Sequence, residues 1–181
     1  MVNFFLNFLV IGIALAQSSE RGNPNYRRLT EIDVNKVRAS IHNFGSSGNS
    51  GVAGSFFYEW PTNSGRSYIA YQALYVGAMV TTDAGEQKPL VTVTHRSDQE
   101  GNSMMWEPVP GYLNPNSTKI AISDDESTWP LYWPDKEGDE NDPGWAGSWN
   151  GYFGKNQFNA GQEIFYKVSD DRNYIVGHPY T

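Results

Sequence analysis

The order of apolar and polar positions along the chain predicts a protein built mainly of strands. Residues 67–80 (SYIAYQALYVGAMV) and residues 88–95 (KPLVTVTH) are rich in aromatic and β-branched side chains, and residues 81–86 between them have the composition of a turn. These segments predict a long hairpin. At about 3.3 Å per residue, 67–80 is too long for one typical strand, so we expect a bend near Gly77 or two successive strands.

Shorter segments of similar composition predict further strands at residues 37–44, 53–58, 119–123 and 163–168. Glycine and proline together make up 28 of the 181 residues, and no helical heptad pattern is present. We therefore expect an all-β, mainly antiparallel fold, a sandwich-like sheet with long irregular loops rich in Trp, Gly and Pro. The glycine-rich residues 45–51 lack the Gly-Lys-Ser/Thr ending of a phosphate-binding loop and predict a flexible connection.

The first sixteen residues have the pattern of a signal peptide. An apolar run from Phe4 to Ala16 is broken only by Asn7, and it ends in the small-x-small sequence Ala-Leu-Ala that signal peptidase accepts. A buried core helix or a short anchor is the alternative interpretation. The run is shorter than the roughly 20 residues that span a bilayer, and no later segment is longer and equally apolar. We expect cleavage before Gln17 and an exported, extracellular or cell-surface chain without a membrane span in its mature part.

The remaining chain divides by composition into two parts. The polar residues 17–36 predict a flexible leader, and residues 37–181 predict one β-rich domain. The sequence stops soon after the apolar Tyr174-Ile175-Val176 with no closing element, so we expect an incomplete domain from the start of a longer protein. The chain has no cysteine, which excludes disulfides, thiolate metal sites and a cysteine nucleophile.

The net charge of −7 comes from a single stretch of the sequence. Acidic residues outnumber basic ones by 20 to 13, which argues against nucleic acid as a partner because phosphate binding needs clustered Lys and Arg. Eight acidic residues and one lysine lie between Asp124 and Asp142, and the rest of the chain is charge-balanced. The acidity therefore marks a local feature.

Part of this acidic stretch is a candidate calcium site. Carboxylates alternate along it and are followed by one more acidic side chain, which gives the candidate ligands Asp135, Glu137, Asp139 and Asp142. Calcium takes six to eight hard oxygen ligands from such flexible segments, although the spacing is not that of an EF-hand loop. The alternative is a solvated acidic loop without metal.

Aromatic residues surround the same stretch. Four of the six tryptophans and a tyrosine flank it, and they form a candidate ligand-binding platform of Trp129, Tyr132, Trp133, Trp145 and Trp149. Core packing is the alternative role of these large side chains. Acidic residues beside tryptophan, as at Glu59 and Glu107, are compatible with a glycoside hydrolase that uses paired carboxylates. No catalytic motif surrounds any histidine or serine, so no catalytic residue is assigned.

Three segments together resemble a known group of proteins. They are GSFFYEWP at 54–61, SYIAYQALYVGAMV at 67–80, and DPGWAGSWNGYFGKNQFNAGQEIFYKVSDD at 142–171. They resemble the N-terminal region of large exported, uncharacterised proteins from marine and sediment bacteria of the Bacteroidetes, Chlorobi and Marinimicrobia kind. Many of those proteins end in a type IX secretion sorting domain. The resemblance implies a β-rich, secreted or surface-displayed module and assigns no activity.

The sequence as a whole favours a non-enzymatic function. We expect an exported interaction or structural module of a larger bacterial protein, with glycans or other surface proteins as partners. The alternative is a carbohydrate-binding domain or a glycoside-hydrolase-type enzyme that uses the Trp-rich, acidic region 124–153. A third interpretation is a structural unit stabilised by Ca²⁺.

Overall fold

A computed structural model describes residues 21–94, 106–130, 149 and 158–169 of the chain. Within these ranges nearly all regular structure is strand, and the pairs are antiparallel. This confirms the predicted all-β, mainly antiparallel class. The described strands form one four-stranded sheet and four two-stranded sheets, so the sandwich-like packing stays a prediction.

The elements follow one another in short pieces. The strands are β1 (Leu29–Ile32), β2 (Ala39–His42), β3 (Ser46–Gly48), β4 (Tyr58–Glu59), β5 (Ser67–Ile69), β6 (Tyr71–Ala73), β7 (Tyr75–Thr81), β8 (Gln87–Val93), β9 (Glu107–Pro108), β10 (Ala121–Ile122), β11 (Ile164–Phe165) and β12 (Val168–Ser169). Three 3₁₀ turns accompany them, namely η1 (Pro24–Tyr26), η2 (Pro110–Tyr112) and η3 (Glu126–Thr128).

The largest sheet has the strand order β1-β2-β3-β6. Its buried positions are mostly polar, and the structure supplies their partners. Ser40 is fully buried; its hydroxyl donates to the carbonyl of Gly48 at 2.9 Å and accepts from the amide of Phe56 at 3.2 Å. A buried polar group without a partner costs free energy, so this hydrogen bonding is what allows serine at the centre of the sheet.

The prediction of a flexible leader over residues 17–36 is wrong for the described part of that segment. Residues 29–32 form β1, which pairs with β2 in the register Leu29↔His42. The side chain of Arg27 also forms an ion pair with Glu107, with Nε donating at 2.8 Å. The four-residue sequence LTEI is too short to announce a strand, and its partner on β2 stabilises it. The domain therefore begins before residue 37.

The glycine-rich residues 45–51 also differ from the predicted flexible connection, because residues 46–48 form β3. Gly45 and Gly48 both have positive φ angles, of 86° and 83°. A Cβ atom on Gly48 would lie 2.6 Å from the carbonyl oxygen of Ala70, and one on Gly45 would lie 2.5 Å from Cγ2 of Thr94. Glycine at these positions allows neighbouring chain segments to approach closely.

The long strand predicted at 67–80 is divided into β5, β6 and β7, with breaks at Ala70 and Leu74 and none at Gly77. Each piece pairs with a different strand: β5 with β4, β6 with β3, and β7 with β8. The hairpin with residues 88–95 is confirmed as the β7–β8 pair. The strand predicted at 53–58 is mostly wrong, because only Tyr58 of that range is in a strand.

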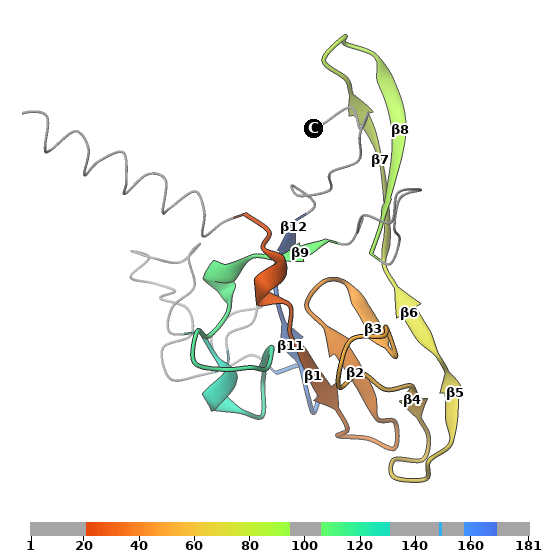
Figure 1. Ribbon diagram of the computed structural model, residues 1–181, viewed down its shortest axis with the longest axis vertical. Helices are drawn as coiled ribbons and strands as arrows, with labels where there is room; N and C mark the ends of the chain where they lie inside the picture. The colour runs from red at the N-terminus through yellow and green to blue at the C-terminus, as the bar shows by residue number, and fades with distance from the viewer. Residues whose placement is uncertain (1–20, 95–105, 131–148, 150–157, 170–181) are drawn as a thin grey trace, which may run out of the picture.

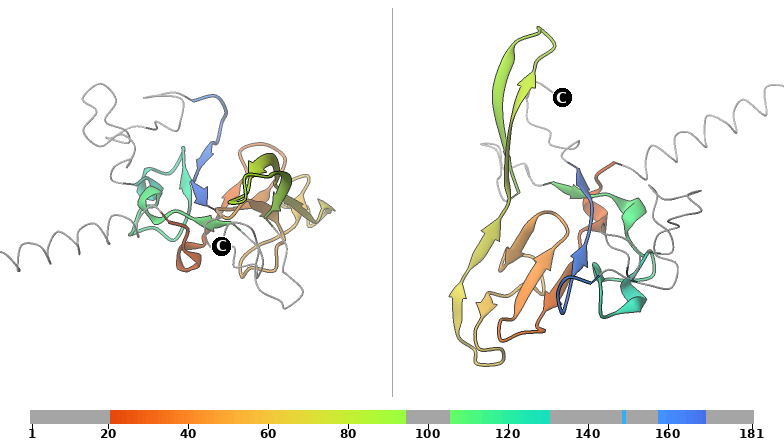
Figure 2. Two further views of the ribbon diagram at one scale, coloured as in Figure 1. Left: turned by 90° about the horizontal axis from the view of Figure 1, so that it is seen from above. Right: turned by 180° about the vertical axis from the view of Figure 1, so that it is seen from behind.

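The hydrophobic core lies where β9 to β12 meet η2 and η3, beside the four-stranded sheet (Figure 2). Its buried side chains are Val109, Tyr112, Ala121, Trp129 and Trp149, with Phe165 packed against them. The two indole rings lie 5.8 Å apart at a tilt of 56°. Aromatic side chains thus supply most of the buried apolar surface in this region.

The β7–β8 hairpin extends away from the rest of the molecule, as both Figure 1 and the right-hand view of Figure 2 show. We call residues 75–93 the arm. No other described strand pairs with β7 or β8. In the part of the chain that the structure describes, no helix has the length and apolar character needed to cross a membrane.

Candidate binding surface

Two members of the predicted aromatic platform are in the core. Trp129 is 8% exposed and Trp149 is 2% exposed. The Nε1 atom of Trp129 donates to the carbonyl of Ile122, and that of Trp149 donates to Glu163 Oε2, each at 2.8 Å. The platform is therefore wrong for these two residues, because their side chains are buried and their N–H groups already have acceptors within the protein. Tyr132, Trp133 and Trp145 lie outside the described residues.

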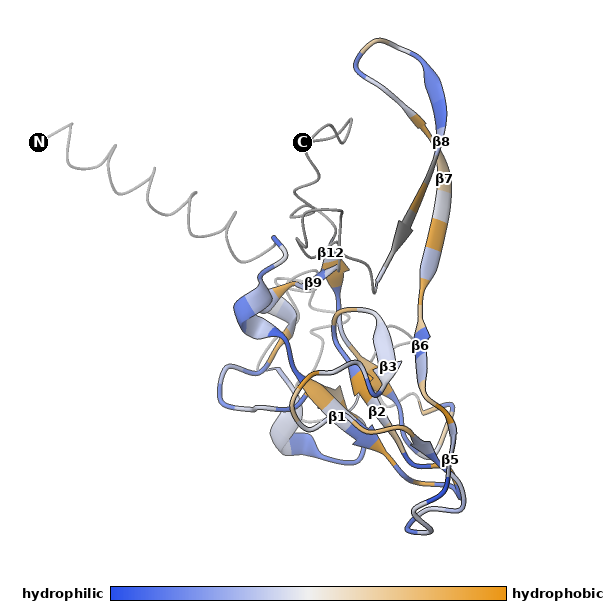
Figure 3. Cartoon of the chain, turned by 45° about the vertical axis from the view of Figure 1, so that its right-hand side comes forward, coloured by the Kyte–Doolittle hydropathy of each residue, from blue (hydrophilic) through white to orange (hydrophobic). Residues whose placement is uncertain are grey.

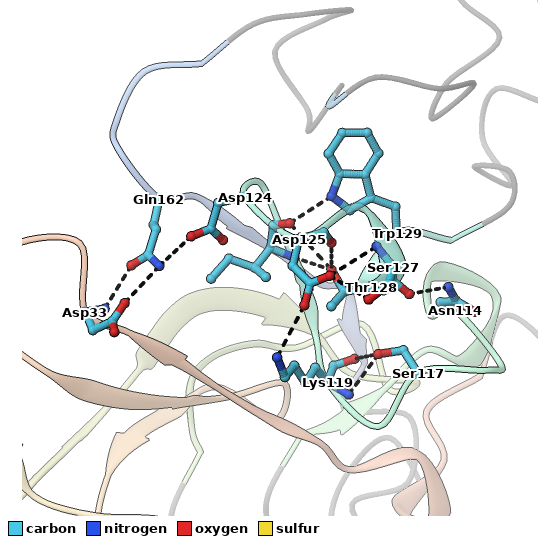
Figure 4. A network of polar contacts seen from close by, with 11 residues as sticks. Asp33, Asn114, Ser117, Lys119, Asp124, Asp125, Ser127, Thr128, Trp129 and Gln162 are labelled. Carbon is cyan, nitrogen blue, oxygen red and sulfur yellow. Dashed lines mark hydrogen bonds and ion pairs between the residues drawn. The ribbon is translucent and has the colours of Figure 1, made fainter.

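The four predicted calcium ligands, Asp135, Glu137, Asp139 and Asp142, also lie outside the described residues, so the calcium hypothesis stays a prediction. It predicts that millimolar Ca²⁺ raises the melting temperature of the wild type and that Asp139→Ala removes this rise. At the described start of the acidic stretch, the carboxylates of Asp124 and Asp125 accept hydrogen bonds from other side chains (Figure 4). The carboxylate of Asp125 accepts from the amide and hydroxyl of Ser127 and from Lys119. These contacts, the Ser127 hydroxyl first, lower its pKa.

Gln162 joins distant segments beside this carboxylate (Figure 4). Its Nε2 atom donates to Asp33 Oδ1 at 3.1 Å and to Asp124 Oδ2 at 2.8 Å, and its Oε1 atom accepts from the amides of Asp33 and Val34. A polar hollow of about 460 Å³ lies here, between the end of β1 and the β10–η3 segment. In the described part of the chain no group of three or more metal-ligating side chains occurs. The hydrogen bonds of Gln162 therefore connect the segment after β1 to the segment after β10, which is a structural role.

The two carboxylates that precede or follow tryptophan are also engaged. Glu59 accepts from the backbone amides of Asn63 at 3.0 Å and Gly65 at 2.6 Å. The Gly65 amide, then the Asn63 amide, lowers the pKa of Glu59, which favours the ionised form over the protonated form that a general acid needs. Glu107 is paired with Arg27. A hydrolase role for this pair gains nothing from the structure.

The loop that follows Glu59 exposes two aromatic rings to solvent. Trp60 is 49% exposed and Tyr68 is 66% exposed, and their ring centroids lie 5.9 Å apart in an edge-to-face arrangement. The amide of Trp60 donates to the carbonyl of Arg66 at 3.0 Å, which closes the loop. In the sequence, Trp60 stands out only as the neighbour of the acidic residue Glu59. Trp60 directly follows β4 and Tyr68 lies in β5, so the pairing of these two strands, which the sequence alone does not give, brings the two rings together.

His42 is a structural residue. It is fully buried, its ring stacks on Phe44 with centroids 5.0 Å apart, and Nδ1 lies 3.1 Å from the Ser46 hydroxyl. Burial lowers its pKa, so the neutral ring is favoured. The side chain holds β2 against the turn that leads into β3.

The arm exposes several apolar side chains to solvent. Met79 is 62% exposed and Val91 is 63% exposed, and Val76 is also half-exposed. Hydropathy colouring shows apolar segments in the middle of the arm and a hydrophilic segment of β8 near the tip (Figure 3). An isolated two-stranded hairpin is marginally stable in water, so exposed apolar positions on such a hairpin are unusual unless something covers them.

The register divides the arm into two faces. Side chains alternate along each strand, so Gly77, Met79, Pro89 and Val91 share one face, where Gly77 is opposite Val91 and Met79 is opposite Pro89. None of these four residues is charged. The charged side chains of the arm are near its tip, where Lys88 forms an exposed ion pair with Glu86 at 2.9 Å.

The base of the arm is fixed to the body. Thr94 is fully buried; its hydroxyl donates to the carbonyl of Gly45 at 2.7 Å, and its amide donates to the carbonyl of Leu74 at 3.3 Å. The amide of Leu74 in turn donates to the Gly45 carbonyl at 3.2 Å. These bonds tie both strands of the arm to the turn between β2 and β3. The arm is thus anchored at one end and projects at the other.

A hollow of about 520 Å³ lies beside this base. Its lining includes Leu74 at the foot of the arm, Ser47 and Tyr58 from the sheet, and Tyr166 from the segment between β11 and β12. The Tyr58 hydroxyl donates to Gln72 Oε1 at 2.8 Å and lies 2.6 Å from the Ser47 hydroxyl. Burial raises the pKa of Tyr166. The hollow mixes apolar and hydroxyl groups, which suits binding better than acid–base chemistry.

The arm and the hollow at its base together form the candidate binding surface of the described structure. The sequence located the hairpin correctly but placed the candidate site elsewhere, in region 124–153. No family model, curated protein or solved structure matches the chain.

Proposed function

We propose that this chain is an exported interaction module that binds another polypeptide through its arm. The observation that carries the proposal is the projecting β7–β8 hairpin, whose middle section exposes Val76, Met79 and Val91. Burial of apolar surface stabilises an association by about 25 cal/mol per Å². A rigidly anchored arm also loses little conformational freedom on binding, which lowers the free-energy cost of association.

Export is part of this proposal. The apolar run that ends at Ala16 and the resemblance to large surface-displayed bacterial proteins both favour it. In a bacterial host that secretes the chain, N-terminal sequencing of the released protein gives Gln17 as the first residue. A released or cell-retained chain that still begins at Met1 overturns the proposed processing.

The interaction is tested by photo-crosslinking from the arm. A photo-reactive amino acid at position 79 of the processed chain forms a covalent adduct with a polypeptide when the culture of the bacterium that secretes the chain is irradiated. The matched control carries the same amino acid at position 34, an exposed valine on the body, and gives little or no adduct. Equal yields from both positions, or none from position 79, contradict the proposal.

A second candidate function is glycan binding, and the exposed Trp60–Tyr68 pair favours it. Exposed aromatic faces on a firmly held loop suit stacking against sugar rings, and the loop here is held by Glu59. Calorimetric titration with cellohexaose and laminarihexaose tests the idea. Binding that Trp60→Ala abolishes and Phe158→Ala leaves intact supports it, since Phe158 is another exposed aromatic residue. Heat of dilution alone at millimolar oligosaccharide removes this candidate for these two sugars.

A further inference from the structure

We infer that the polypeptide bound by the arm is a second copy of this chain, and that the two copies join by antiparallel pairing of β7 with β7. This inference rests on the proposed function. It follows from the hydrogen-bond parity of the arm, from the difference between its two edges, and from the match between β7 and its own reverse.

The hydrogen bonds at both ends of the hairpin show which alternate residues of β7 bond to β8. At the base, the amide of Thr94 donates to Leu74, and near the tip the amide of Thr82 donates to Glu86. Hydrogen-bonded and non-hydrogen-bonded pairs alternate along an antiparallel ladder. Both ends therefore give the same assignment, in which the even-numbered residues of β7 bond to β8. The amides and carbonyls of Gly77 and Met79 point to the outer edge of β7.

The two edges of the arm are not equivalent. On β8, Pro89 is opposite Met79 at a non-hydrogen-bonded position, so the missing proline N–H lies on the outer edge and costs the hairpin nothing. Lys88 stands next to it. Proline and lysine are the residues that natural proteins use to prevent strands from pairing with an edge. The sequence of β7, YVGAMVT, contains neither residue and no charge. Among the described strands, none pairs with the outer edge of β7 from Val76 to Val80, while Pro89 and Lys88 protect the edge of β8.

The open edge also fits itself. With the two-fold axis at Ala78, an antiparallel β7–β7 pair places Met79 of each copy opposite Gly77 of the other. The same register sets Val76 against Val80 and Ala78 against Ala78. The long Met79 side chain then lies over a residue that has no side chain, and every cross-strand pair in this section is uncharged. A two-fold interface requires such a self-complementary surface, so a second copy satisfies both the backbone groups and the side chains.

The expected affinity is modest. A strand of the length of β7 is about 24 Å long at 3.4 Å per residue. An edge contact of that length buries less than the roughly 1,600 Å² of a standard stable interface, which corresponds to a weak or transient complex. We therefore expect a dissociation constant of the order of micromolar. The dimer contains a continuous four-stranded sheet, which removes the marginal stability of a lone hairpin.

Sedimentation velocity over a concentration series tests the inference on the full chain. The wild type moves from monomer to dimer as concentration rises. Met79→Pro removes one outward N–H from β7 without removing a bond of the hairpin, and it shifts the dissociation constant at least tenfold toward monomer. Val91→Pro makes the same change on the outer edge of β8 and leaves the dimer intact. Equal effects of the two variants contradict pairing through β7.

A crosslink between copies tests the register. The chain has no cysteine, so Ala78→Cys introduces a single thiol at the two-fold axis. There the two residues form a non-hydrogen-bonded pair with Cα atoms about 4.5 Å apart, a separation at which disulfides form. Mild oxidation gives a disulfide-linked dimer of Ala78→Cys and far less of Val91→Cys, whose side chain is also exposed but lies on the other strand. Equal crosslinking of both variants overturns the register.

The photo-crosslinking experiment separates the two proposals. An adduct of twice the chain mass from position 79 supports the second copy. An adduct with a different polypeptide, from a chain that stays monomeric to several hundred micromolar, overturns the inference but leaves the proposed function in place. The absence of any adduct overturns both.

Discussion

The core around Trp149 and the arm use the same kinds of residue in opposite surroundings. In the core, Trp129 and Trp149 pack against each other, and their N–H groups donate to the carbonyl of Ile122 and to the carboxylate of Glu163. In the arm, Met79 and Val91 belong to two well-paired strands but remain mostly exposed. Strand pairing satisfies backbone groups and does not bury side chains. Burial needs a further layer, which β9–β12 and the 3₁₀ turns supply in the core.

The largest effect that sharpens this comparison is expected at Trp149. Trp149→Ala creates a cavity in the core and leaves Glu163 without an indole donor. We expect a loss of about 3–5 kcal/mol in the free energy of unfolding. Urea denaturation monitored by circular dichroism measures the loss. A change below about 1 kcal/mol contradicts the assignment of Trp149 to the core.

A second, smaller difference concerns two threonine hydroxyls. The Thr128 hydroxyl is buried, accepts from the amide of Ile122 at 3.0 Å and donates to the carbonyl of Asp125 at 2.7 Å. Thr128→Val leaves that amide without a partner and costs about 1–3 kcal/mol. The matched change in the arm is Thr81→Val, which removes an exposed bond with Gln87 and has almost no effect. Equal destabilisation in denaturant titrations breaks the distinction.

The stability of the four-stranded sheet is expected to depend on pH through His42. Burial lowers its folded-state pKa below the ordinary value of about 6.5. As pH falls below about 6.5 the unfolded chain therefore binds more protons than the folded chain, and stability decreases until the folded pKa is reached. The contribution of the neutral His42 to stability is complete above the unfolded-state pKa of about 6.5. Melting temperatures between pH 7.5 and 5 fall less steeply in His42→Asn than in the wild type; parallel curves contradict this role.

The smallest effect is expected in the arm. Met79→Ala, measured in dilute protein where the chain is monomeric, changes the free energy of unfolding by less than about 0.5 kcal/mol, because the side chain is mostly in water already. The same variant weakens the dimer in sedimentation velocity. A loss of unfolding stability as large as that of a core residue shows instead that Met79 packs within its own chain.

Several features were predictable because they depend on local chemistry. The apolar, β-branched segments around the turn at 81–86 gave the β7–β8 hairpin, and the scarcity of helical patterns gave the all-β class. The strand at residues 29–32 was missed because four residues carry too little pattern. The division of residues 67–80 was missed because it depends on which strand each piece meets: β4, β3 or β8.

The candidate site was harder to predict than the fold. Trp129 and Trp149 stand beside an acidic stretch in the sequence, which suggested a ligand platform, but contacts with Tyr112 and Val109 from another segment bury them. Met79 and Val91 look like core residues in the sequence, and they are exposed because no described element packs on the arm. Burial is a property of long-range contacts, so composition could not distinguish the two sets.

The sequence by itself determined the all-β class, the hairpin around residues 81–86 and where the net negative charge lies, because these depend on neighbouring residues. Only the tertiary structure decided which aromatic and apolar side chains are buried, which carboxylates have partners, and which strand edge is open. These properties arise when residues far apart in the chain meet, and the pairing of β7 with β8, away from the body, is what leaves one uncharged edge available for a partner.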